Sequence, residues 1–154
     1  MVSRGSGTEP PKSLLAIDFG LRRMGIASGS LFTGTATALQ TVPAQAGRPD
    51  WNRMDRLIAE WRPELLVLGL PRNTDGTDSD MTLAVLEFAT SLQERYELPV
   101  EFVDERYTSA EAESLLREQR RQGVRNKKLT KEDVDAMAAC LIAESWIRDR
   151  PNPA

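Results

Sequence analysis

Histidine is absent from this chain of 154 residues, and cysteine occurs only once. The absence of histidine removes the most common general base and any zinc site that depends on imidazole ligands. Cys140 cannot form an intramolecular disulfide, and its apolar neighbours indicate a buried thiol in a reducing compartment. Acid–base chemistry must therefore come from carboxylates, lysine, tyrosine or water bound to a metal.

Long hydrophobic runs are also missing. No apolar stretch approaches the roughly 20 residues that a membrane-spanning helix needs. Residues 1–13 are polar, and the apolar run that follows them is interrupted at Asp18, too soon for the hydrophobic part of a signal peptide. We therefore expect a cytoplasmic protein that has no membrane partner.

The composition fits one globular domain, with 40% apolar residues, 28% charged residues and a formal net charge of -3. We predict a flexible N-terminal segment at residues 1–13, a single domain at residues 14–148 and a flexible tail at residues 149–154. The net charge does not itself indicate nucleic-acid binding. An acidic protein can still bind phosphates through a local basic patch, because the field at a site depends mainly on nearby charges.

Hydrophobic periodicity predicts strands at residues 14–17, 24–27, 33–42, 65–70 and 100–104. The expected helices begin at short polar capping residues, namely Asp50, Thr77 or Ser79, Thr108 and Thr130. The first helix is expected to end before residue 63, the second near residue 96 and the last near residue 148. In the second helix, the predicted apolar face consists of Leu83, Leu86, Phe88, Ala89 and Leu92.

This order of elements predicts an α/β fold with a five-stranded mixed sheet flanked by helices. The first three strands are expected to form an antiparallel meander, and the other two follow helices and are expected to join by right-handed parallel crossovers. Because the first, fourth and fifth strands would run parallel, their carboxyl ends meet at one edge of the sheet. Open α/β sheets bind their ligands at that edge.

Acidic residues gather near this edge. Asp18 ends an apolar strand, where a charge is costly unless it is paired or bound to a metal. Asp104 and Glu105 follow the fifth strand, and because neighbouring strand residues face opposite ways, alternation alone leaves open which of them faces the cleft. On the last helix, Asp135 shares a face with the apolar residues at i+3, i+4, i+7 and i+11, whereas Asp133 is better placed for capping.

Three carboxylates that converge in a partly dry cleft repel one another unless a cation lets them stay ionised. Oxygen ligands without histidine or cysteine favour Mg2+ or Mn2+ over zinc, and two such ions about 4 Å apart suit phosphodiester hydrolysis. Each acid considered alone could instead have a purely structural role, because an aspartate at a strand end is more often a turn or cap residue. Convergence of the three acids is what favours a metal site.

Four short motifs occur in an order that closely resembles the YqgF/RuvX family. They are LAIDFG at residues 15–20 with GIA at 25–27, GLP at 69–71 with Asn73 and 75–76, DERYTS at 104–109, and VDAMAA at 134–139. The resemblance covers roughly residues 14–147. Each motif is short, but the ordered set is highly specific.

The resemblance implies a ribonuclease H-like fold with catalytic, metal-binding acids at Asp18, Glu105 and Asp135, and it thereby favours Glu105 over Asp104. The chain departs from the family pattern at Leu21, where threonine is usual, and at residues 72 and 74 in the loop after the fourth strand. These departures affect substrate contacts and leave the acids intact.

A local basic patch lies at residues 117–131, just before Asp135. A charge run is ordinarily a solvated face, but beside the acids it could hold a phosphate backbone. The predicted nucleic-acid contacts are Arg22, Arg23, Asn73, Arg106, Thr108, Arg121, Arg125, Lys127 and Lys128. The three tryptophans, Trp51, Trp61 and Trp146, are interpreted as packing anchors.

Members of the family are described as Holliday junction resolvases and as nucleases that mature the 5′ end of small-subunit ribosomal RNA. The resemblance therefore implies a two-metal endonuclease that processes the 5′ end of pre-16S rRNA in ribosome biogenesis. The alternatives are a Holliday junction resolvase and a non-catalytic nucleic-acid-binding or ribosome-assembly module. The expected partners are an rRNA precursor or branched DNA and ribosomal particles, and the expected state is a monomer or weak homodimer.

A different enzyme class shares part of this pattern. Residues 18–20 and 25–27 also resemble the first phosphate loop of the actin and sugar-kinase clan. Those proteins need two such lobes, and this chain has the length of one, so ATP hydrolysis is the weaker hypothesis.

Overall fold

One mixed sheet forms the centre of the computed structural model, which describes residues 12–71, 75, 77–104, 117–118 and 130–149. Its strand order is β4-β3-β2-β1-β5-β6. In chain order the strands are β1 (Ser13–Asp18), β2 (Arg23–Ser30), β3 (Thr35–Gln45), β4 (Arg48–Pro49), β5 (Leu65–Leu70) and β6 (Val100–Asp104). Strands β1, β2 and β3 pair antiparallel, whereas β1, β5 and β6 run parallel. The predicted meander and parallel crossovers are therefore confirmed.

The strand that the sequence did not predict is β4. It pairs with the end of β3 through Ala44 opposite Pro49 and Gln45 opposite Arg48. The turn between the two strands has φ angles of 52° at residue 46 and 80° at Gly47, and two consecutive residues with positive φ favour a tight hairpin. The described sheet therefore has six strands in place of the predicted five.

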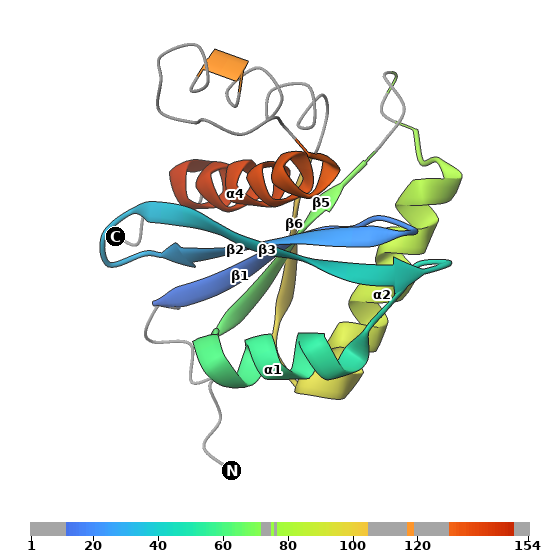
Figure 1. The fold of residues 1–154 in the computed structure, drawn as a ribbon, viewed down its shortest axis with the longest axis horizontal. Coiled ribbons are helices and arrows are strands. Elements are labelled where there is room, and N and C mark those ends of the chain that lie inside the picture. Colours follow the sequence, from blue (N-terminus) through green and yellow to red (C-terminus); the bar gives the residue numbers. More distant parts are fainter. Residues whose placement is uncertain (1–11, 72–74, 76, 105–116, 119–129, 150–154) are drawn as a thin grey trace.

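The helices of the described residues are α1 (Trp51–Trp61), α2 (Asp80–Tyr96) and α4 (Lys131–Asp149). Figure 1 shows α4 against one face of the sheet and α1 and α2 against the other. Within the described ranges, no helix combines the length and the apolar character that crossing a bilayer requires. The helix predicted to begin at Thr108 lies outside the described residues.

Short polar side chains begin the helices, as predicted. The Asp50 carboxylate accepts hydrogen bonds from two backbone N–H groups in the first turn of α1. Ser79, rather than Thr77, caps α2. At the start of α4, the backbone N–H of Thr130 donates to Asp133 Oδ2 and the N–H of Asp133 donates to Thr130 Oγ1, both at 3.1 Å. The predicted capping role of Asp133 is thus confirmed.

Some predicted packing residues are exposed. Leu83 and Leu86 of α2 are 57% and 37% exposed, and Trp61 at the end of α1 is 41% exposed. The buried face of α2 instead begins with Thr82 and Val85, each one residue earlier than the predicted positions. Apolar residues at several adjacent helical positions are compatible with more than one face, and packing against the sheet decided between them.

Alternating residues of β1 divide the core into two layers. Leu15 and Ile17 pack in the cluster that contains the buried residues of α1 and α2, whereas Leu14 packs with Ile142 of α4. Because successive strand side chains face opposite ways, Asp18 falls on the same face as Leu14. The last residue of β1 therefore lies on the α4 side of the sheet.

The backbone of β2 approaches α4 very closely at Gly25. A Cβ atom on Gly25 would lie 1.9 Å from the carbonyl oxygen of Asp135, so only a residue without a side chain permits this approach. Small residues continue the contact, because Ala27, Ala139 and Cys140 form a buried cluster between β2 and α4. Burial raises the pKa of the Cys140 thiol to about 11, in agreement with the predicted buried thiol.

We expect Gly25→Ala to destabilise the protein more than Gly29→Ala in the same strand. The new methyl group at Gly25 meets backbone atoms of α4, whereas the nearest atom at Gly29 is the Leu14 Cγ at 2.9 Å, in a side chain that can adjust. Overpacking typically costs about 1–3 kcal/mol, and Gly25→Ala should lie at the upper end. Urea denaturation of the two variants measures the difference, and equal losses of unfolding free energy would contradict this account.

Asp55 of α1 connects to α2 through a hydrogen-bonded network. Arg95 donates to the two carboxylate oxygens at 2.8 and 2.7 Å, and the Tyr96 hydroxyl donates at 2.6 Å. These hydrogen bonds, that of Arg95 first, lower the pKa of Asp55 to about 2. Arg95 also lies 4.7 Å from the ring centroid of Trp51. The network therefore links the two helices that cover the same face of the sheet.

Asp55→Asn should lower the melting temperature slightly at neutral pH, because the network is largely exposed and surface ion pairs contribute little. A carboxylate with a lowered pKa stabilises the folded state above its unfolded pKa of 3.8 and loses that contribution as the pH falls through about 2. The difference in melting temperature between the variant and the wild type should therefore shrink over that range, as measured by circular dichroism. A difference that is constant with pH would argue against the network.

Candidate functional site

Asp18 is the last residue of β1, and it is 9% exposed. Among the described residues, only Thr82 accompanies it as a buried polar or charged residue. Asp18 lies opposite Gly25 in the ladder between β1 and β2. A carboxylate in this position needs compensating charge or hydrogen bonds, because removing an ion from water is costly.

Asp135 lies in the first turns of α4, and its side chain is 21% exposed. Arg23, the first residue of β2, donates a hydrogen bond from Nε to Asp135 Oδ2 at 2.5 Å. Burial raises the pKa of Asp135 above its ordinary value, and the hydrogen bond and charge of Arg23 offset part of this shift. A further positive charge here would stabilise the ionised carboxylate.

Gly25 lies next to the backbone of both acids. It is the ladder partner of Asp18, and its Cα packs against the backbone of Asp135. Both acids therefore lie on the α4 face, at the end of the sheet where the parallel strands finish. The expectation that Asp135 points toward the sheet agrees with its partial burial.

The third predicted acid, Glu105, lies outside the described residues. The same is true of the predicted contacts Asn73, Arg106, Thr108, Arg121, Arg125, Lys127 and Lys128. Across the described ranges, no group of three or more histidine, cysteine, aspartate or glutamate residues is arranged to hold a metal ion. The structure thus places two of the three predicted acids, together with Arg22 and Arg23.

The faces of β6 bear on the choice between Asp104 and Glu105. The indole N–H of Trp146 in α4 donates to Glu101 Oε1 at 3.0 Å, and Val103 packs in the cluster on the α4 side. Asp104 is the next residue, so alternation places it on the opposite face from Asp18. Trp146 acts as a packing residue, as predicted.

The turn after Asp18 is held against the hairpin of β3 and β4. The N–H of Gly47 donates to the carbonyl of Leu21 at 3.0 Å, and the N–H of Ala44 donates to that of Arg22 at 2.7 Å. The Arg22 side chain is exposed, as a phosphate contact requires, whereas the Arg23 side chain is engaged with Asp135. The backbone of this turn is therefore fixed close to the acids.

Thr82 was not singled out from the sequence, although it fixes the end of β5. Its buried hydroxyl donates to the carbonyl of Pro71, and it accepts a hydrogen bond from the backbone N–H of Ser79 at 2.9 Å. The available signal was its position three residues after the helix cap, which is the spacing of a capping box. Thr82 thereby ties the carboxyl end of a central strand to the start of α2.

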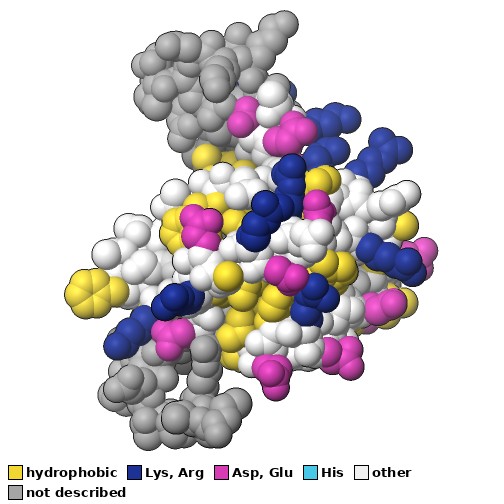
Figure 2. Space-filling view, turned by 60° about the horizontal axis from the view of Figure 1, so that its bottom comes forward, with side chains coloured by type: hydrophobic (Ala, Val, Ile, Leu, Met, Phe, Trp, Pro, Cys, Tyr) yellow, Lys and Arg dark blue, Asp and Glu magenta, His cyan; other side chains and the backbone are white. Residues whose placement is uncertain are grey.

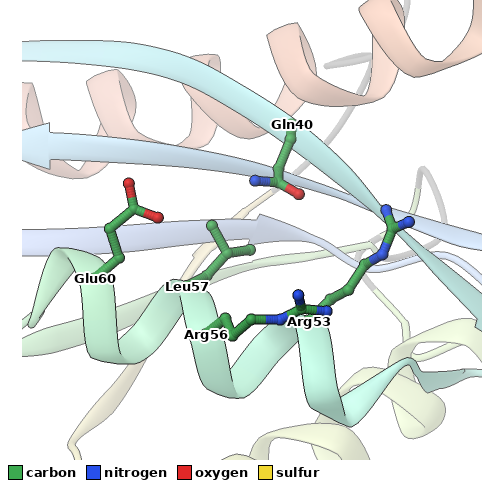
Figure 3. Close-up of a pocket in the computed structure, with 5 residues that line it drawn as sticks. All are labelled: Gln40, Arg53, Arg56, Leu57 and Glu60. Atoms are coloured by element: carbon green, nitrogen blue, oxygen red, sulfur yellow. The ribbon is translucent and has the colours of Figure 1, made fainter.

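Two of the pockets formed by the described residues have volumes of about 320 Å3. One lies between β3 and α1 and is lined by Gln40, Arg53, Arg56, Leu57 and Glu60. Figure 3 shows its side chains projecting from α1, with Gln40 extending from β3. The other lies beside Phe19, between the hairpin of β3 and β4 and the helices α1 and α2. On this side of the molecule, apolar side chains reach the surface between charges of both signs (Figure 2).

Comparison with known proteins gives a family and relatives that cover almost the whole chain. The family model RuvX, described as Holliday junction resolvase, matches residues 12–149. A relative from Azotobacter vinelandii named "Putative pre-16S rRNA nuclease" is 44% identical over 92% of this chain and 96% of its own length. Relatives of the same name from Francisella tularensis subsp. novicida and Glaesserella parasuis are 41% and 45% identical, over 90% of this chain and 98% of their own lengths.

A solved structure shares the fold. The structure of T. thermophilus RuvC in complex with Holliday junction substrate matches with a TM-score of 0.53 and 16% identity, covering 88% of this chain and 94% of that chain. The predicted ribonuclease H-like fold is thereby confirmed. The family model, which matches residues 12–149, and the identities of 41–45% to the relatives above lead to one assignment: the chain belongs to the RuvX (YqgF) family.

Proposed function

We propose that this chain is a divalent-metal-dependent endonuclease that processes the 5′ end of pre-16S rRNA. The observation that carries the proposal is the placement of Asp18 and Asp135, which are distant in the sequence, on one face of the sheet beside Gly25. The name shared by the relatives supports RNA as the substrate. Holliday junction DNA is the second candidate substrate, because the family description names a Holliday junction resolvase.

The ligands available at this place suit Mg2+ or Mn2+. Asp18 and Asp135 supply carboxylate oxygens, which hard divalent cations prefer, and the chain has no histidine. Since burial raises the pKa of Asp135, a divalent cation would stabilise the charged form of this carboxylate. One or two such ions would offset the charge that develops on a phosphodiester and lower the barrier to attack by water.

We assign the third ligand to Glu105. Glu101 and Val103 of β6 lie on the α4 side of the sheet, and alternation places Asp104 on the other side. The orientation of Asp104 away from Asp18 makes it the weaker candidate, and the family pattern assigns the acid to Glu105.

Arg23 has a double role in this proposal. Its guanidinium is a permanent cation, so before a metal binds its hydrogen bond favours the ionised form of the Asp135 carboxylate and opposes the effect of burial on the pKa. A cation at Asp135 would weaken this pair and make Arg23 available to a phosphate. Arg22 is its exposed neighbour, and two adjacent arginines would hold the nucleic-acid backbone close to the acids.

Asp18→Asn should abolish cleavage and leave the fold intact, because the amide has nearly the shape of the carboxylate without its charge. We expect the rate to fall at least about 100-fold, since a metal contributes several kcal/mol to the transition state. The measurement is cleavage of a pre-16S rRNA 5′ fragment and of a four-way DNA junction, each with Mg2+ or Mn2+. Unchanged cleavage by Asp18→Asn would refute the metal assignment.

Substitutions at two consecutive residues, Asp104 at the end of β6 and Glu105 after it, provide a matched comparison for the third ligand. Glu105→Gln should cause a loss similar to that of Asp18→Asn, whereas Asp104→Asn should retain most of the activity because Asp104 lies on the other face. Loss of activity in Asp104→Asn, with activity retained in Glu105→Gln, would instead assign the third metal ligand to Asp104. Faster cleavage of the junction than of the RNA would favour the second candidate substrate.

Arg23→Gln should raise the pKa of Asp135 in the metal-free protein. The hydrogen bond and charge of Arg23 lower this pKa, so their removal leaves the effect of burial less opposed. The carboxyl carbon resonance of Asp135, followed by NMR against pH, reports the change. Arg22→Gln is the control and should leave this titration unchanged; a pKa that stays the same in Arg23→Gln would contradict the described pairing.

A further inference from the structure

A pocket with aromatic walls lies at the same end of the sheet as the acids, but on the face covered by α1 and α2. Its volume is about 320 Å3, and its lining includes Phe19, Trp51 and Phe88. The ring centroids of Phe19 and Phe88 are 5.2 Å apart, and those of Trp51 and Phe88 are 6.1 Å apart. Phe88 is buried, whereas Phe19 and Trp51 are partly exposed. Aromatic surface is therefore accessible from solvent inside this pocket.

The backbone ties this pocket to Asp18. Phe19 follows Asp18 directly, and it packs against the cluster on the α1 and α2 side, whereas Asp18 lies on the α4 face. Gly47 closes over Phe19, because a Cβ on Gly47 would lie 3.1 Å from the ring. The hydrogen bond from Gly47 to Leu21 holds the connecting turn in place. The pocket is therefore fixed to the turn that directly follows Asp18, at the edge of the sheet.

Polar groups complete the lining. Glu87 and Ser91 come from α2, and Arg48 comes from β4. A carboxylate and a hydroxyl can bond the donor and acceptor groups on the edge of a nucleobase, and an arginine can pair with a phosphate. Leu21 also lines the pocket and is 47% exposed. Aromatic rings can stack on a nucleobase, Glu87 and Ser91 can hydrogen-bond its edge, and Arg48 can pair with its phosphate. This combination of groups is suited to recognising a nucleotide.

We infer that this pocket binds one unstacked nucleobase of the substrate strand, next to the phosphodiester that is cleaved at the acids. The inference rests on the proposed function, which brings a nucleic acid to this edge of the sheet. Proteins hold single-stranded bases by stacking them on aromatic side chains and bonding their edges. The volume lies at the lower end of small-molecule sites, as a single base requires.

The pocket shown in Figure 3 lacks these features. None of its lining residues is aromatic. Arg53 lies 3.8 Å from Asp50, and Arg56 donates to the Asn52 carbonyl at 3.4 Å. Ser91 of the aromatic pocket likewise donates to the Glu87 carbonyl at 3.5 Å, so the aromatic lining is what distinguishes the two pockets. The aromatic pocket is therefore the base site, and Trp51 serves as one of its walls as well as a packing residue.

The test follows Trp51 by fluorine NMR in the full chain labelled with 5-fluorotryptophan, with the resonance assigned by Trp51→Phe. The probes are the four nucleoside 5′-monophosphates and ribose 5-phosphate, added without metal. We expect the Trp51 resonance to shift with at least one nucleotide and to remain in place with ribose 5-phosphate. Because no cleavage is needed, this measurement is independent of the nuclease activity.

Two substitutions on α2 provide a matched pair. Ala84→Phe places a ring inside the pocket, whereas Leu83→Phe places the same ring on an exposed neighbouring position. Ala84→Phe should abolish the nucleotide-dependent shift and raise the KM for RNA at least about fivefold, the lower limit for loss of one stacked base. Leu83→Phe should behave as the wild type.

The outcomes separate the two proposals. Three results would overturn the base site: a Trp51 resonance that does not move, an equal shift with ribose 5-phosphate, or equal behaviour of the two α2 variants. Cleavage by the wild type would still support the nuclease in each case. If the wild type cleaves neither substrate, the proposed nuclease is overturned. If the nucleotide shift is nevertheless present and Ala84→Phe blocks it, the base site is supported.

Discussion

The contact of Gly25 with the backbone of Asp135 is the constraint on which the arrangement of the site depends. Without a Cβ at Gly25, α4 lies directly on β2, and small residues extend this contact through Ala27 and Ala139. The helix thereby reaches the position at which Asp135 stands beside the ladder partner of Asp18. A larger residue at Gly25 would separate the helix from the sheet, and with it one acid from the other.

Burial at this contact has an electrostatic consequence. Asp18 is almost completely buried, and burial raises the pKa of Asp135. Carboxylates in such surroundings are unfavourable unless a cation balances them. Arg23 provides one positive charge by its hydrogen bond to Asp135. Under the proposed function, a divalent cation would supply further positive charge beside these two carboxylates.

The sheet also separates two kinds of chemistry. The acids lie on the α4 face, whereas the aromatic pocket lies on the face of α1 and α2. Asp18 and Phe19 are consecutive, and the alternation of an extended chain sends their side chains to opposite faces. A nucleic acid at this edge could therefore present a phosphate to one face and a base to the other.

Local patterns were sufficient to predict much of this protein. Alternation and apolar runs indicated β1, β5 and β6, and short polar residues indicated the helix caps, Thr77 or Ser79 for α2 and Thr130 with Asp133 for α4, because these features depend on residues close in sequence. The same patterns, with the resemblance to the family, singled out Asp18 and Asp135. They overestimated the packing of Leu83 because helical periodicity permits more than one buried face.

What the sequence by itself determined is therefore the order of the elements, their caps and the acids that could act together. The tertiary structure decided the pairing of Arg23 with Asp135, the strand β4, the buried hydroxyl of Thr82 and the pocket beside Phe19. Each of these depends on the approach of segments that are separated along the chain or on a turn closed by pairing. Residue type and spacing alone do not specify such distances, since they follow from how closely backbones can pack.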